Sequence, residues 1–308
     1  MSNKEHRVSK KYAIRKFSAV GLFLILYALF VLILPYFFRM YMDIIDSTIL
    51  KDELLYYGIY FIIILFGTLI PFFLMRTYFK VSHKKMNRSI SASFVDLFVQ
   101  SIVCFTLCIT LTYVSNILFA YLGLEGKLMS SIGFSFEEVN LSNLLYVFML
   151  IIVTPIIEEY AFRGVLLNTL GKYGKMFGLY ASAVVFAFAH MNFSEFLPAF
   201  AMGVQLGKIS LRYRSIRPTI IIHMLFNALI YTLCVIPSSI TKYMAYVLSA
   251  IFMFTVYLIL TGKYERVQIQ KLHSDRITNI LFYTRPTVVF ALLLMVIYSL
   301  LFIFVGWL

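Results

Sequence analysis

Charged residues are scarce in this sequence, and their scarcity excludes most kinds of soluble protein. Only 13% of the 308 residues are charged, whereas 61% are hydrophobic and 18% are aromatic. Soluble domains carry about 25% charged residues. The composition therefore excludes a soluble globular domain. It also excludes an intrinsically disordered chain, which needs low hydrophobicity and high charge.

Cysteine is also rare, and this excludes a disulfide-rich secreted module. The three cysteines, Cys104, Cys108 and Cys234, all lie inside apolar runs. They form no Cys-x-x-Cys pair and no Cys/His spacing of the kind that binds zinc. We interpret all three as small buried hydrophobic residues.

Long apolar runs are what the sequence has in abundance. A helix that crosses a bilayer needs about 20 predominantly apolar residues. No repeat and no Gly/Ser-rich linker divides the chain, so we predict one integral membrane domain over residues 1–308. The predicted fold is all-α, a polytopic helical membrane protein with eight or nine transmembrane helices and a buried polar cavity. The nine predicted spans cover residues 18–38, 54–75, 94–118, 142–168, 176–191, 196–212, 217–235, 243–261 and 287–307.

The net charge of +13 has a topological explanation in this scheme. Lys and Arg gather in alternate connections, beginning with the N-terminal segment, whereas the opposite connections collect Asp and Glu. Because cytoplasmic loops are rich in Lys and Arg, we predict a multi-pass protein of the cell membrane with a cytoplasmic N-terminus. No small-residue cleavage site follows the basic N-terminal segment, so we expect the first run to be retained as a span. The basic loops then contact anionic lipids of the bilayer, and we expect no nucleic-acid partner.

Ionisable residues deep inside the predicted fourth span are the first functional signal. Glu158, Glu159 and Arg163 lie in an otherwise apolar run, where charged groups are costly and usually functional. In an α-helix, Glu159 and Arg163 stand one turn apart and can pair. Glu158 is rotated away from that face and is available as a general base. The alternative is a structural ion-pair network, for which one Glu/Arg pair would suffice.

Two histidines in apolar spans give the second and third signals. Phe186 and His190 are four residues apart in the fifth span, and His223 and Asn227 have the same spacing in the seventh. An imidazole and a carboxamide on one stripe can both donate hydrogen bonds to a developing oxyanion. The alternative is ordinary helix–helix hydrogen bonding. One shared, water-containing cavity would accommodate the polar groups of all three helices, and together they suit amide hydrolysis.

Two geometric expectations accompany these segments. On the predicted span limits, His190 lies near the outer end of its helix and His223 nearer the inner side. The fifth span must therefore tilt, re-enter or begin deeper if both are to meet Glu158. In the sixth span, Ala199, Gly203 and Gly207 form a stripe of small residues, which predicts close helix packing.

The order and spacing of the three segments resemble the signature motifs of the CPBP intramembrane proteases. This family includes the type II CAAX prenyl endopeptidases and the bacteriocin-processing, Abi-like proteins. The resemblance covers residues 142–235, the expected catalytic core, and leaves residues 1–141 and 236–308 as flanking transmembrane helices. The motifs read Glu158-Glu159-x-x-x-Arg163, Phe186-x-x-x-His190 and His223-x-x-x-Asn227.

The resemblance implies a CAAX-type intramembrane endopeptidase, a hydrolase whose site lies in a cavity reached from one side of the bilayer. Carried over by position, Glu158 would activate the attacking water with the assistance of His190. His223 and Asn227 would stabilise the tetrahedral oxyanion.

The remaining motif residues, Glu159, Arg163 and Phe186, would shape the site. We expect no metal ligands and no cofactor, because the sequence has no His-Glu-x-x-His motif and Asn is a poor zinc ligand. A mechanism that uses a divalent metal such as zinc stays open as the alternative.

Three functions remain in competition at this point. The leading prediction is cleavage of a membrane-embedded or lipid-modified peptide, and the short polar N-terminus without an organelle signal favours a bacterial protein. The runner-up is a non-proteolytic membrane regulator that binds a membrane protein partner such as a sensor kinase. A proton-coupled transporter would also explain buried Glu and His, but it would usually show internal repeats or paired broken helices.

Overall fold

The computed structural model contains helices and connecting turns, with no β-strand in the residues that it describes. This confirms the predicted all-α fold. The described residues are 3–45, 53–82, 86, 94–124, 141–235, 240, 243, 247, 250–257, 261 and 276–305.

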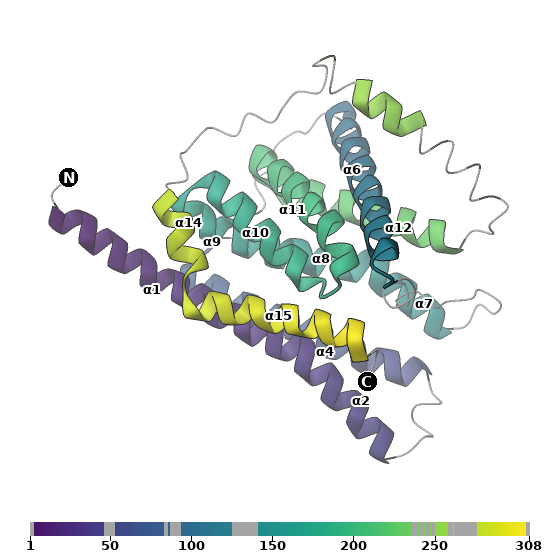
Figure 1. Cartoon of the computed structure of the whole chain (residues 1–308), viewed down its shortest axis with the longest axis horizontal. Helices are drawn as coiled ribbons and strands as arrows, with labels where there is room; N and C mark the ends of the chain where they lie inside the picture. The colour runs from purple at the N-terminus through teal and green to yellow at the C-terminus, as the bar shows by residue number, and fades with distance from the viewer. Residues whose placement is uncertain are drawn as a thin grey trace.

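Two long antiparallel helical segments form the N-terminal part of the bundle (Figure 1). The first runs without a break through α1 (Asn3–Ala28), the π-helical turn η1 (Leu29–Ile33) and α2 (Leu34–Ile45). The second is α4 (Glu53–Phe79). Their antiparallel course follows from the ring of Tyr27 against Phe72 and from the close approach of Gly67 to Phe30.

The middle of the chain forms α6 (Phe94–Tyr121) and then one composite helical segment over residues 141–173. The composite segment changes its hydrogen-bonding pattern several times. Its parts are α7 (Leu141–Phe148), η2 (Met149–Val153), α8 (Thr154–Glu158), η3 (Glu159–Leu167), α9 (Asn168–Leu170) and η4 (Gly171–Tyr173).

Three further helices complete the interior of the bundle, and two close the chain. The three are α10 (Lys175–Ala189), α11 (Phe193–Tyr213) and α12 (Arg217–Val235). The closing pair is α14 (Arg276–Tyr283) and α15 (Pro286–Val305).

Several of these helices are apolar enough for a bilayer, and the chain is a helical membrane protein. Four stretches have both the length and the hydropathy of a span, and three shorter apolar helices accompany them. Parts of the predicted eighth span, 243–261, lie outside the described residues. The count of eight or nine spans stays a prediction. The four long stretches are Lys11–Val31, Tyr57–Phe79, Phe94–Tyr121 and Leu141–Tyr173.

Contacts at one end of the bundle bring together connections that we predict to lie on the same side of the membrane. The Lys16 ammonium lies 4.4 Å from the ring centre of Tyr78, and Lys172 Nζ donates to the Phe79 carbonyl at 2.7 Å. Phe17 packs edge-on against Phe282 at 5.4 Å. These contacts bring the starts of the first and last predicted spans and the ends of the second and fourth to the same end of the bundle, as the predicted alternation of direction requires. That this end faces the cytoplasm stays a prediction.

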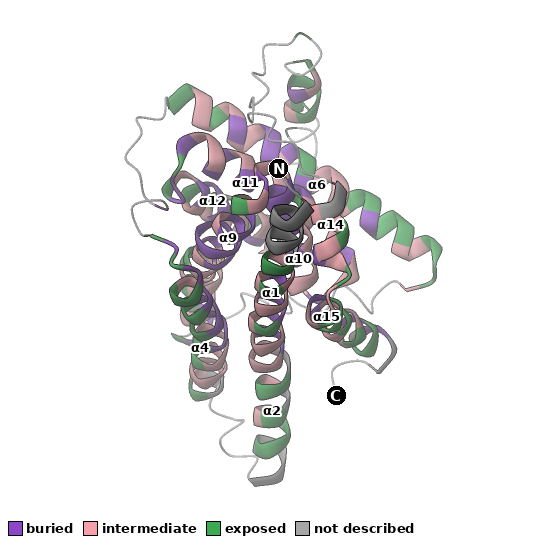
Figure 2. Cartoon of the chain, turned by 90° about the vertical axis from the view of Figure 1, so that its left-hand side faces the viewer, coloured by how far each residue is buried: buried purple, intermediate pink, exposed green. Residues whose placement is uncertain are grey.

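The predicted stripe of small residues does bring two helices close together. α11 packs along α10, and a Cβ atom added at Gly203 would lie 2.9 Å from Ala183. A Cβ atom at Gly207 would lie 2.5 Å from the end of Leu179. The glycines therefore let α11 approach α10 more closely than side chains would permit. Both helices contain many buried residues, and buried residues gather in the interior of the bundle (Figure 2).

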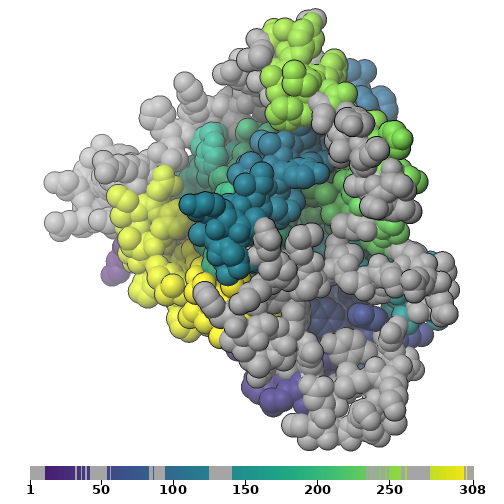
Figure 3. Space-filling model, turned by 45° about the vertical axis from the view of Figure 1, so that its right-hand side comes forward, coloured from purple at the N-terminus to yellow at the C-terminus, as the bar shows by residue number. Residues whose placement is uncertain are grey.

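Apolar side chains also cover the outside of the bundle. In Figure 3, α6 and α15 both reach the surface of the face shown. Their exposed residues are large and apolar, which suits contact with lipid and not with water. They include Phe98, Tyr113, Ile117, Phe290 and Leu293.

Candidate active site

The composite helix that carries the two adjacent glutamates is not a regular α-helix. The sequence pattern predicts α-helical spacing, whereas Met149–Val153 and Glu159–Leu167 are π-helical. The Thr154 amide donates to the Met149 carbonyl, five residues back. π-helical turns are rare and often lie at functional sites. Glu158 ends the short α-helical turn between the two π-helical stretches.

Pro155 accounts for an unusual hydrogen bond in the first π-helical stretch. In an i→i+5 pattern the Leu150 carbonyl would accept from residue 155, but proline has no amide hydrogen. The side chain of Asn227 supplies the bond instead, because its Nδ2 donates to the Leu150 carbonyl at 2.9 Å. One motif residue on α12 thus stabilises the backbone that precedes Glu158.

Glu159 and Arg163 form the buried ion pair that the sequence predicts. Arg163 Nη1 donates to Glu159 Oε1 at 2.7 Å, and the side chains are 2% and 0% exposed. Arg163 also lies 4.1 Å from the ring centre of Phe186 and 3.5 Å from the Met202 carbonyl of α11. The guanidinium therefore joins three helical segments, and a charge at this depth is tolerated because it is paired.

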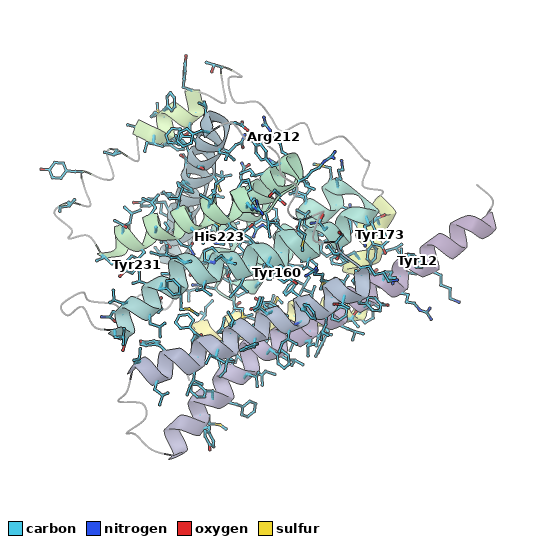
Figure 4. All side chains as sticks on the ribbon, turned by 180° about the vertical axis from the view of Figure 1, so that it is seen from behind. Tyr12, Tyr160, Tyr173, Arg212, His223 and Tyr231 are labelled. Atoms are coloured by element: carbon cyan, nitrogen blue, oxygen red, sulfur yellow. The ribbon has the colours of Figure 1, made fainter. Side chains whose placement is uncertain are left out.

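His223 lies between the two glutamates. Its Nδ1 is 3.0 Å from Glu159 Oε1, and its Nε2 is 3.7 Å from Glu158 Oε2. An ionised carboxylate only accepts hydrogen bonds, so Nδ1 carries a proton and Nε2 faces Glu158. Glu159 thus fixes the orientation of the imidazole, as carboxylates do for catalytic histidines. Figure 4 shows His223 in the middle of the bundle.

His190 meets this cluster through Phe186. The Phe186 ring lies 4.6 Å from the His190 ring and 6.2 Å from the His223 ring, edge-on in both cases. His190 Nδ1 donates to the Phe186 carbonyl at 2.9 Å, which leaves Nε2 as an acceptor in the neutral ring. α10 ends at Ala189, and His190 is the first residue of the turn into α11. Although His190 lies at a helix end, both histidines therefore flank one phenylalanine.

The structure thus brings six of the seven motif residues into one connected cluster. The seventh, Asn227, is joined instead to the backbone of the composite helix at Leu150. His223 and Asn227, which the sequence predicts as joint donors to an oxyanion, have different partners here, Glu159 and the Leu150 carbonyl. Their joint role stays a prediction. The partner of His223 lies 64 residues away in sequence, and no spacing rule within α12 could have found it.

Glu195 is a neighbour of the cluster that the sequence motifs do not include. It lies in the first turn of α11, where Asn192 caps the helix and donates to Glu195 Oε1 at 3.1 Å. Its carboxylate interacts electrostatically with both His190 and Glu158. Sequence reasoning missed it because an acidic residue at the start of a span is common.

The negative and positive charges of the cluster do not balance, and one bound proton would balance them. Around His223, the carboxylates of Glu158 and Glu159 face the one guanidinium of Arg163, so these side chains carry one uncompensated negative charge while His223 is neutral. A proton on His223 or on Glu158 would remove that charge, which is costly away from water. Glu158 is the more accessible carboxylate, with 26% of its side chain exposed. The arrangement can therefore take a proton from a bound water and release it again.

A resident metal fits this arrangement poorly. Within the described ranges, no three His, Cys, Asp or Glu side chains are grouped as metal ligands would be. Arg163, a cation, already occupies the position beside Glu159. We therefore derive no step that runs through a metal.

These features define a class of protein: a polytopic helical membrane protein with a buried cluster of Glu, Arg and His. Comparison with known families agrees with it. Residues 140–229 match the family model described as type II CAAX prenyl endopeptidase Rce1-like, which confirms the resemblance of this segment to the CPBP proteases. The match supports a CAAX-type intramembrane protease activity in general terms. The comparisons with curated proteins and with solved structures gave no match.

Proposed function

We propose that the protein is an intramembrane endopeptidase that hydrolyses a membrane-embedded or lipid-modified peptide. The observation that carries the proposal is the position of Glu158. It is a partly accessible carboxylate beside an oriented imidazole, within an otherwise apolar helical bundle. A structural ion-pair network needs Glu159 and Arg163 but has no need of Glu158.

The proposed reaction begins with a water molecule bound to Glu158. Glu158 takes a proton from the water while the water oxygen bonds to the carbonyl carbon of the scissile peptide. The tetrahedral oxyanion then collapses, the C–N bond breaks, and the departing amine takes up the proton. His190, with Nε2 as an acceptor, assists the proton transfers.

The other residues of the cluster keep this geometry in place. Glu159 orients His223, and Arg163 compensates the buried charge of Glu159. Protonated His223 would direct its Nε2 hydrogen toward the site and stabilise negative charge there. We further propose that the chain lies in a bacterial cell membrane with its N-terminus in the cytoplasm, as the loop charges predict.

Peptide profiling in the native membrane tests the proposal. Membranes that contain wild-type protein are compared with membranes that contain Glu158→Gln at matched abundance, and small membrane peptides are quantified by mass spectrometry. The proposal expects at least one processed peptide to disappear in the variant. A deletion phenotype that Glu158→Gln restores in full would contradict it and favour a regulator that binds a partner, the second candidate.

A further inference from the structure

Met191, the residue after His190, is held in a backbone conformation that few residue types adopt. Its φ angle is +54°, in the left-handed region that glycine enters freely and that strains a bulky residue. In the part of the chain that the structure describes, the other non-glycine residues with positive φ are Lys80 and Arg214. Both of these are exposed, whereas Met191 is buried in the hydrophobic core. A buried side chain therefore stabilises a costly backbone conformation beside a motif histidine.

The turn at Met191 lets His190 keep helical geometry at the very end of α10. His190 has helical dihedral angles, with φ −73° and ψ −19°, and its ring reaches back one turn to the Phe186 carbonyl at 2.9 Å. The Met191 amide closes the last turn by donating to the Phe188 carbonyl at 3.0 Å. A left-handed residue directly after the last helical residue ends a helix abruptly. The chain therefore leaves α10 within one residue, and the His190 ring stays against Phe186.

Asn192 fixes the chain on the other side of Met191. Its Oδ1 accepts from the amide and the hydroxyl of Ser194, at 3.1 and 2.8 Å, and so caps α11. The rings of Phe188 and Phe196 contact each other across the turn, with 4.8 Å between their centres. Strained residues persist where the surrounding structure over-determines them, and they cluster at functional sites. Met191 is therefore confined between two ordered helix ends.

We infer that Met191 is a positioning residue for His190, an inference that rests on the proposed peptidase function. The buried Met191 side chain anchors the left-handed turn, and the turn fixes the imidazole that assists the proton transfers of Glu158. A group that transfers protons must stay within hydrogen-bond reach of the reacting atom, and a misplacement of about 1 Å can slow a reaction about 10²-fold. Met191 therefore contributes to kcat through His190 and not through contact with the substrate.

Truncation of the Met191 side chain tests the inference. Met191→Gly adopts the left-handed conformation freely but has no anchor in the core, whereas Met191→Leu keeps a side chain of similar volume. Arg214→Gly is the matched control, because it relaxes the same backbone conformation at an exposed position, at the opposite end of α11 from His190. Each protein is assayed in lipid vesicles with quenched fluorescent, lipid-modified peptides. The imidazole signals of the same proteins, labelled with 13C-histidine, are recorded by NMR in micelles, and the His190 signal is the one that His190→Ala lacks.

The expected result in Met191→Gly is a shifted or broadened His190 signal and a kcat about 10–10²-fold lower, with KM and the His223 signal unchanged. Met191→Leu and Arg214→Gly should match wild type in both measurements. If Met191→Gly does not fold, Met191→Ala makes the same comparison.

Two results would overturn the positioning role and leave the peptidase function intact. One is a His190 signal or a kcat in Met191→Gly that matches wild type, within about twofold for kcat. The other is an equal disturbance of the His190 and His223 signals, which would report a general loosening of the bundle. Absence of cleavage by wild-type protein on every peptide would instead overturn the proposed function, and the NMR comparison would still show whether Met191 holds His190 in place.

Discussion

Removal of the Arg163 guanidinium should destabilise the protein severely, since Glu159 would remain as an unpaired buried charge. In Arg163→Met the apolar side chain fills most of the space, but the carboxylate 2.7 Å away loses its counterion. Breaking a buried pair in this way costs about 3–5 kcal/mol. Loss of the cation–π contact with Phe186, at 4.1 Å, adds about 1–2 kcal/mol. The total of about 4–7 kcal/mol reaches the lower end of the whole stability of an ordinary domain, about 5–15 kcal/mol.

The assay is equilibrium unfolding of purified protein in mixed detergent micelles, followed by circular dichroism. The control is Arg212→Met, because Arg212 pairs with Asp96 at 3.4 Å in a partly exposed position, where a pair contributes about 0–1 kcal/mol. A double variant, Glu159→Gln with Arg163→Met, removes both charges and should be more stable than Arg163→Met alone. The reasoning fails if Arg163→Met loses no more stability than Arg212→Met, or if the double variant is the least stable of all.

Three further predictions concern the backbone, the helix packing and the metal. Asn227→Ala should cost about 1–3 kcal/mol by leaving the Leu150 carbonyl without a donor, and much less in a Pro155→Ala background, where residue 155 regains its amide hydrogen. Additive losses in that double-mutant cycle would contradict the account. Gly203→Val should force α11 away from α10 and lower the unfolding free energy by about 1–3 kcal/mol. Gly58→Ala, in a helix position with open space around it, should be neutral or slightly stabilising. Purified active protein should keep its activity after exhaustive chelation, and a loss that zinc restores would show a metal mechanism.

Much of this architecture is readable from local sequence patterns. Apolar runs predict the helices, and the four-residue spacing of Glu159 and Arg163 predicts their ion pair, which the structure confirms. The stripe that contains Gly203 and Gly207 predicts the close packing of α11, because small residues act through local shape alone.

The rest depends on contacts between distant segments. In the π-helical stretch that precedes Glu158, Pro155 removes a donor and Asn227 supplies one from another helix. The place of His223 between the glutamates depends likewise on how α12 packs against the composite helix. Tyr27 belongs to no motif, so its ring contact with Phe162 is visible only once α1 is packed.

The central claim is that Glu158 activates the water that cleaves a peptide bond. The most direct measurement is the kcat of Glu158→Gln beside wild type in reconstituted vesicles, with a peptide found to be processed in native membranes. The account predicts that wild type cleaves and that Glu158→Gln is about 10²–10⁴-fold slower, with an unchanged unfolding midpoint. A variant that cleaves as fast as wild type would contradict the claim.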